Sequence, residues 1–93
     1  MQETGGMKMA LIQDMKKYKN LTEREQDIRQ YILEHPEKIE EMSSRELGHA
    51  TFTSAASVTR FCQKLGTKGF PEFKLQLVRE LQYGTMEEEE VVT

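Results

Sequence analysis

The sequence predicts an all-α fold, a single five-helix bundle. Apolar residues recur at spacings of three and four along nearly every segment and almost nowhere at two. Capping boxes at Thr22 with Glu25 and at Ser43 with Glu46 mark two helix starts. The 93 residues suffice for one modest core. Because the single cysteine excludes an internal disulfide, burial of apolar side chains must hold the fold.

The first helix is predicted at residues 7–17. Residues 1–6, which include two adjacent glycines, are expected to be a disordered amino terminus. The apolar residues of this helix and its end share one face, made of Leu11, Ile12, Met15 and Tyr18. This face is apolar enough to form a dimer surface.

The second helix begins at the capping box of Thr22 and must end by His35, because Pro36 disfavours helical geometry in the residue before it. Its inward stripe is predicted to comprise Ile28, Tyr31, Ile32 and His35. A short turn that carries Ile39 and Met42 follows.

Two short helices joined by a tight turn are predicted at residues 43–51 and 54–65. Ser43 and Ser54 are their caps. Gly48 lies inside the first of them, where a glycine costs ~1 kcal/mol relative to alanine. It therefore indicates a place where another helix passes too closely for a side chain. The inward residues are predicted to be Leu47, Val58, Phe61, Cys62 and Leu65.

The last helix starts with Pro71 at a first helical position, after a loop that opens with Gly66 as a C-terminal cap. Phe73, Leu77 and Leu81 form its stripe, and it ends by Gly84. Residues 84–93 contain four consecutive glutamates and are expected to be an acidic tail or linker. The bundle is thus predicted to span residues 7–83.

Charge is segregated along the chain. The net charge is −3, but residues 43–79 hold six basic and two acidic side chains, a local sum of +4. Exposed charges more than about 8 to 10 Å away are largely screened at physiological salt. The acidic average therefore does not exclude a nucleic acid as partner.

The two short helices and their tight turn form a helix-turn-helix signature of the homeodomain-like kind. With Leu47, Val58 and Phe61 packed inward, a small and polar face of the second helix points outward. This face is predicted to hold Ser54, Ala55, Ala56, Ser57, Thr59, Arg60, Gln63 and Lys64. A major groove about 12 Å wide admits such a helix, and Thr, Gln and Arg can bond base edges.

Several segments together resemble the amino-terminal domain of the RpiR family of bacterial transcription regulators. They are residues 21–25 (LTERE), 31–36 (YILEHP), 54–66 (SAASVTRFCQKLG) and 68–70 (KGF) before Phe73 and Lys74. The resemblance spans about residues 7–81. It implies a DNA-binding regulator of carbohydrate or amino-sugar metabolism, with a following sugar-phosphate-sensing domain that lies outside these residues. Phe52 stands where a glycine commonly supplies a positive φ angle, which leaves the shape of the turn open.

The partner predicted is double-stranded operator DNA, bound by a homodimer. Arg60 is the foremost candidate for a DNA contact, to a base or to a phosphate, and Thr59 and Gln63 share its side of the helix. Ala56 and Ser57 permit close approach, and Lys64 and Lys68 are expected to contact phosphates. A backbone clamp is expected from Ser43, Ser44, Arg45, Thr67, Lys68 and Gly69. A sugar phosphate effector would act only through the absent domain.

Other functions find less support in the sequence. A small helical protein–protein adaptor or dimerisation module remains the alternative to a DNA-binding domain. Cys62 lies on the inward stripe, and His35 and His49 have no third ligand nearby, so no metal, cofactor or catalytic residue is predicted. No apolar run approaches the ~20 residues of a membrane span, and no signal peptide is visible. A cytoplasmic protein without a membrane partner is therefore expected.

Overall fold

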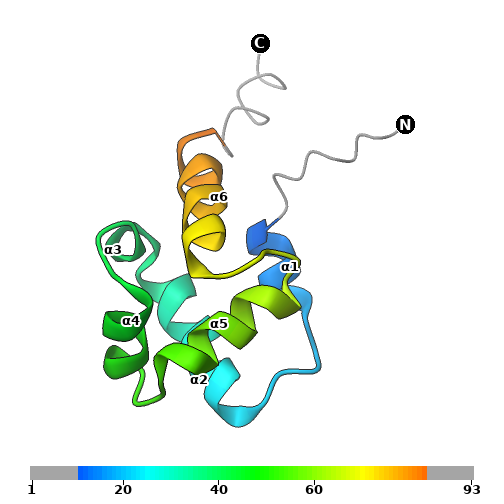
Figure 1. Cartoon of the computed structure of the whole chain (residues 1–93). Coiled ribbons are helices and arrows are strands. Elements are labelled where there is room, and N and C mark those ends of the chain that lie inside the picture. The colour runs from blue at the N-terminus through cyan, green and yellow to red at the C-terminus, as the bar shows by residue number, and fades with distance from the viewer. Residues whose placement is uncertain (1–10, 84–93) are drawn as a thin grey trace.

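The computed structural model describes residues 11–83, which form six helices and no strand (Figure 1). The helices are α1 (Leu11–Lys17), α2 (Glu23–Glu34), α3 (Pro36–Ile39), α4 (Ser44–Ala50), α5 (Ala55–Lys64) and α6 (Phe70–Tyr83). The all-α class is confirmed. The expected disordered amino terminus, the first four residues of the predicted helix at 7–17 and the acidic tail lie outside the described residues.

The predicted number of five helices is wrong, because the segment after His35 forms α3 instead of a turn. Pro36 occupies the first helical position of α3, where its fixed φ angle suits a helix and its missing amide hydrogen costs nothing. The same proline that ends α2 therefore starts the next helix. Ile39, at the end of α3, is fully buried in the core.

The core lies where α2, α4, α5 and α6 meet. It is formed by fully buried side chains, among them Ile28, Ile32, Leu47, Val58, Phe61, Phe73 and Leu77. The rings of Phe61 and Phe73 pack edge to face with their centroids 5.9 Å apart, a favourable geometry for two aromatic side chains. The predicted inward residues of the two short helices are confirmed, except that Leu65 is only partly buried. On the last helix the prediction that Leu81 faces inward is wrong, because its side chain is 39% exposed.

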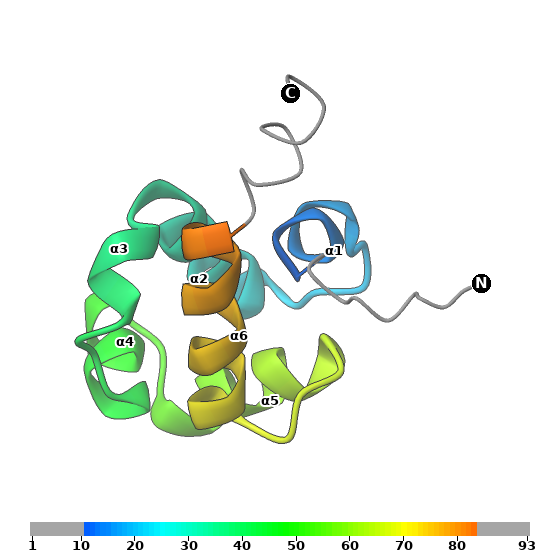
Figure 2. The same ribbon diagram turned by 90° about the horizontal axis from the view of Figure 1, so that it is seen from above.

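Helix α1 completes this core. Leu11 and Met15 are buried, and Ile12 and Tyr18 pack against the same cluster. Viewed from above, α1 lies on one side of α6 and α3 with α4 on the other (Figure 2). The expectation that this face of the first helix is a dimer surface is wrong, because its apolar side chains are used within the chain.

Long-range hydrogen bonds hold both ends of α1. The carboxylate of Glu80 in α6 accepts from the amide of Leu11 and, at 3.0 Å, from that of Ile12. At the other end, the guanidinium of Arg29 donates to the carbonyls of Met15 at 3.2 Å and Tyr18 at 2.7 Å. A carboxylate near a helix start and a cation near its end both favour the helix dipole. This short helix thus depends on partners from α2 and α6.

The helix starts predicted at Thr22, Ser43 and Ser54 are confirmed, whereas the last helix begins at Phe70, one residue before the predicted Pro71. The side-chain oxygens of Thr22 and Ser43 each accept from the amide three residues on, at 3.2 and 3.0 Å. The glutamate at that position in turn accepts from the amide of the capping residue. Ser54 accepts from the amide of Ser57 at 3.1 Å. These local bonds satisfy amides that a helix start would otherwise leave without a partner.

Gly48 is the point of closest approach between α4 and α5. A Cβ atom placed on it would lie 2.6 Å from the carbonyl carbon of Ser54 and 3.0 Å from the amide nitrogen of Ala55. These are backbone atoms, which cannot move aside without displacing the start of α5. The close passage predicted from this glycine is confirmed.

One residue of the turn between α4 and α5 has the left-handed backbone conformation of a tight turn, although it is not a glycine. Phe52 has φ 60° and its side chain is 93% exposed. Such a conformation costs ~1–3 kcal/mol for a bulky residue. Hydrogen bonds on either side hold it, from the amide of Thr53 to the carbonyl of Gly48 at 2.7 Å and from Thr51 Oγ1 to the carbonyl of Leu47 at 2.9 Å.

We expect Gly48→Ala to lower the free energy of unfolding by about 1–3 kcal/mol, since the added methyl group must push α5 away from α4. Urea unfolding followed by circular dichroism measures the change. Gly69→Ala is the matched control, because a Cβ there would meet only Pro71 Cδ at 3.8 Å. Equal stability of the two variants would contradict the role assigned to Gly48.

Candidate nucleic-acid interface

The side of α5 opposite the core is open to solvent. Val58 and Phe61 are fully buried, while Ser54, Ala56, Arg60 and Gln63 are exposed, and Ala55 and Thr59 are half-buried. Seen from above, α5 lies along one edge of the molecule (Figure 2), and a short turn joins it to α4 (Figure 1). Its exposed face begins with small side chains and continues with polar and basic ones.

Two residues predicted for this surface are buried instead. Ser57 was expected on the outward face, but it is 4% exposed, and its hydroxyl accepts from that of Ser54 at 3.1 Å. Thr67 was expected in a backbone clamp, but it is buried, with Oγ1 donating to the carbonyl of Cys62 at 2.8 Å. Both hydroxyls serve the ends of α5, so neither side chain faces a ligand.

Lys64 makes contacts within the domain. Its ammonium lies 2.6 Å from Glu25 Oε1 and 3.1 Å from the carbonyl oxygen of Asn20. The side chain of Glu25 is 5% exposed, so its carboxylate needs this partner. Lys64 therefore has a structural role that the sequence did not predict, since it ties the end of α5 to the start of α2, and its phosphate contact stays a prediction.

The Glu25 carboxyl has an altered pKa. Burial raises the pKa, but the hydrogen bond from Lys64, the bond from the amide of Thr22 and the charge of Lys64 lower it more, so the net pKa lies below the usual value. A lowered pKa means that the carboxylate form is more stable in the folded protein than in the unfolded chain.

The remaining predicted residues lie at the two flanks of α5. Arg45 near the start of α4 and Lys68 in the loop before α6 are exposed. Gln63 Nε2 donates to the carbonyl of Lys68 at 3.2 Å, which brings this loop beside the end of α5. Ser43 is occupied as a helix cap and Ser44 is half-buried. No carboxylate within residues 11–83 forms an ion pair with Arg45, Arg60 or Lys68.

Two buried glutamates and Phe52 were not predicted as important. Glu25 was recognised only as a capping residue, and Glu80 was not singled out. Their partners lie 39 and 69 positions away in the sequence, so no local pattern points to them. For Phe52 the signal was present, since a bulky residue stands where a tight turn needs a positive φ angle.

In the described part of the chain, no group of residues is suited to metal-dependent or thiol chemistry. Residues 11–83 contain no cluster of three His, Cys, Asp or Glu side chains that could hold a metal ion. Burial raises the pKa of the Cys62 thiol to about 12, so this thiol stays protonated and unreactive. Among the helices of the described region, none is long and apolar enough to cross a membrane.

Comparison with known proteins identifies this arrangement. The family model described as a helix-turn-helix domain of the rpiR family matches residues 7–84, most of the chain. This chain belongs to the RpiR family of helix-turn-helix domains. The resemblance drawn from the sequence is confirmed, and the relatives matched are HTH-type transcriptional regulators.

Individual relatives agree with this assignment. An HTH-type transcriptional regulator of Caldanaerobacter subterraneus is 37% identical over 91 residues, covering 90% of this chain and 32% of that protein. The regulator HexR of Pseudomonas aeruginosa is 33% identical over 78 residues, covering 84% of this chain and 27% of that protein. This chain therefore spans about a quarter to a third of the length of these relatives.

The fold is shared with a solved structure. The crystal structure of the amino-terminal domain of the transcriptional regulator YbbH from Bacillus subtilis has a TM-score of 0.66 to this RpiR-family domain at 37% identity. The match covers 75% of this chain and 83% of that chain. The six-helix arrangement is thus similar to that of a helix-turn-helix regulator domain.

We expect Lys64→Met to lower the free energy of unfolding by about 1–3 kcal/mol at neutral pH, because it leaves the Glu25 carboxylate buried without its cation. The folded pKa of Glu25 is depressed, so the stability gained from the pair is present above the unfolded pKa and is lost as the pH falls through the folded pKa. The difference between variant and parent should therefore shrink in acid.

Urea unfolding at a series of pH values tests this dependence. Lys68→Met is the matched control, since this exposed lysine has no ion pair within the described chain. A Lys64→Met deficit that stays constant from neutral to acidic pH would show that the Glu25 pair does not contribute as described.

Proposed function

We propose that this RpiR-family domain binds double-stranded operator DNA sequence-specifically, with α5 in the major groove. The observation that supports this most directly is the outward face of α5, where Thr59, Arg60 and Gln63 stand clear of the core formed by Val58 and Phe61. Base edges in the major groove offer donors and acceptors that these three side-chain types can bond. The small Ala55 and Ala56 near the helix start permit close approach.

The flanking cations would position the domain without reading sequence. The side chains of Arg45 and Lys68 are exposed and form no ion pair within residues 11–83, so both are suited to phosphate oxygens. Ser54 is exposed at the start of α5 and completes this set. Ser43 and Ser44 have at most a secondary role, because one is a helix cap and the other is half-buried.

Membership of the family supports a proposal about the biological setting. We propose a transcription regulator of carbohydrate or amino-sugar genes, located in the cytoplasm and acting as a homodimer on paired half-sites. The relatives are about three to four times as long as the part that this chain covers. A sugar-phosphate-sensing domain in that additional length would supply effector control.

A protein–protein adaptor is the alternative function, and salt distinguishes the two. Each phosphate contact lowers the logarithm of the association constant for DNA by ~0.9 per tenfold increase in salt. If Arg45, Arg60 and Lys68 each contact a phosphate, this logarithm should fall by roughly 2 to 3 per tenfold increase in salt for each bound domain. Fluorescence anisotropy with a labelled duplex measures this slope. An adaptor would show no salt-dependent DNA binding of this kind, and that result would exclude the proposed function.

We expect Arg60→Ala to weaken binding to the selected operator by ~1–3 kcal/mol if Arg60 bonds a base edge. Selection from a random DNA pool first supplies the operator, and titration of the variant on operator and on unrelated DNA follows. A loss confined to the operator indicates base reading, whereas an equal loss on both indicates a phosphate contact. Lys38→Ala on α3 removes the same charge from an exposed site away from α5 and serves as control. Unchanged affinity of Arg60→Ala for both DNAs would contradict its place in the interface.

A further inference from the structure

Helix α6 presents an apolar strip to solvent on the side opposite the core. Phe73 and Leu77 face inward and are fully buried, but Leu75 is 56% and Leu81 39% exposed, and Val78 between them is half-buried. Within residues 11–82, Phe52 is the only other large hydrophobic side chain that is exposed. The strip is thus the main apolar surface that the described chain leaves uncovered.

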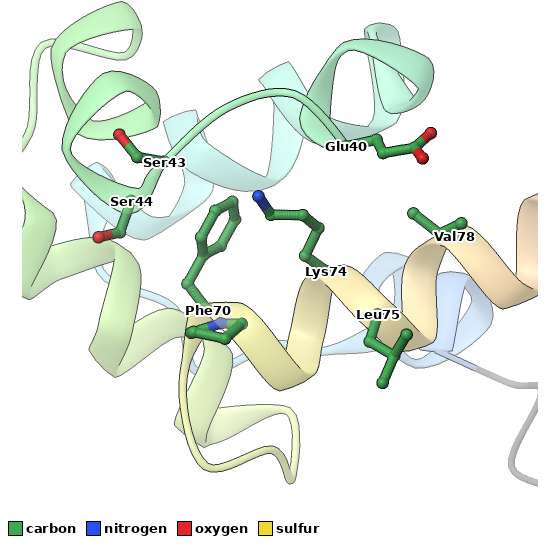
Figure 3. Close-up of a pocket in the computed structure, with 8 residues that line it drawn as sticks. Glu40, Ser43, Ser44, Phe70, Lys74, Leu75 and Val78 are labelled. Carbon is green, nitrogen blue, oxygen red and sulfur yellow. The ribbon is translucent and has the colours of Figure 1, made fainter.

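A groove runs beside this strip, between α6 and the segment from α3 to α4. It has a volume of about 700 Å³. Figure 3 shows Phe70, Lys74 and Val78 directed toward that segment, with Leu75 at the outer edge. The ammonium of Lys74 lies 5.2 Å from the centroid of the Phe70 ring. An apolar side chain of another molecule could therefore enter this groove, whose two sides carry both apolar and polar side chains.

We propose that a second copy of this chain docks on this surface, with the two α6 helices antiparallel. The proposal rests on the proposed function, since a domain that reads paired half-sites needs two copies. A two-fold pair uses the same patch twice, so Leu75 of each copy would pack near Val78 and the groove of the other. The strip then becomes the centre of a closed interface.

Charge complementarity favours the antiparallel arrangement. Glu72 and Arg79 are exposed and lie seven residues apart, so both flank the strip on the same side of α6. With Leu75 opposite the partner's Val78, Glu72 lies near the partner's Arg79, and symmetry repeats the pair. In a parallel two-fold pair this flank of one helix would face the other flank of its partner, so Glu72 and Arg79 would not meet across the interface.

The position of α6 leaves α5 free for DNA. Figure 1 shows α6 extending away from α5, with the turn between α4 and α5 at the opposite end of the molecule. Arg60 and Gln63 are not part of the groove or of the strip. The same dimer could therefore present two recognition helices at once.

Sedimentation equilibrium of the 93-residue chain tests the interface. We expect a monomer–dimer equilibrium whose dissociation constant rises at least about tenfold in Leu75→Glu, because a carboxylate would be buried at the centre. Gln13→Glu makes a similar change at an exposed position of α1 and should leave the equilibrium unaltered. A monomer at all concentrations, or equal association of Leu75→Glu and the parent, would overturn the proposal.

A charge exchange tests the orientation. Arg79→Glu alone should weaken the dimer, and the double variant Glu72→Arg with Arg79→Glu should recover it, because the exchanged charges again face each other. Circular dichroism shows that each variant is folded, which matters for Glu72→Arg since Glu72 accepts from the amide of Lys68 at 2.9 Å. A double variant that is folded but does not recover dimer formation would overturn the antiparallel pairing.

DNA binding separates failure of the dimer from failure of the proposed function. A monomer that still binds a single half-site with a steep salt dependence would overturn the dimer and leave the DNA-binding function standing. A dimer abolished by Leu75→Glu that shows no salt-dependent DNA binding would retain the interface and exclude the function.

Discussion

The close passage of α4 over the start of α5 at Gly48 is the constraint on which the rest of this domain depends. Since a Cβ would lie 2.6 Å from the Ser54 backbone, only glycine lets the two helices meet so closely. That distance seats Val58 and Phe61 in the core beside Leu47. Because a helix has fixed periodicity, seating one face of α5 determines which residues stand on the other. The outward position of Arg60 and Gln63 thus follows from a contact on the opposite side of the helix.

Buried carboxylates hold the elements around this helix pair. Glu25 connects α2 to α5 through Lys64, and Glu80 connects α6 to α1 through the amides of Leu11 and Ile12. Each carboxylate lies in a place where an unpartnered charge would be costly, so these pairs penalise any alternative packing. A domain of 93 residues with a small core gains from such bonds a defined orientation of short helices that would be marginal alone.

The features that the sequence could predict are those that depend on residues close together in the chain. The capping serines and threonine, the inward stripe of α5 and the meaning of Gly48 depend on residues within one or two turns, and they were predicted correctly. The actual positions of Lys64, Ser57 and Thr67 depend on partners brought together by folding, so periodicity alone placed Ser57 and Lys64 with the outward residues. The first helix shows the same limit, because an apolar stripe does not reveal whether its partner is the same chain or another.

Phe52 combines an unfavourable backbone conformation with an exposed aromatic ring. The tight passage at Gly48 requires a turn with one residue of positive φ, and phenylalanine meets this requirement at a cost of ~1–3 kcal/mol. The bonds of Thr51 and Thr53 to the carbonyls of α4 hold the turn in that state. Its ring gains no burial in return, since it is 93% exposed next to the start of α5. Stability alone would favour glycine or asparagine here, so the turn keeps its shape through its hydrogen bonds and not through the choice of residue.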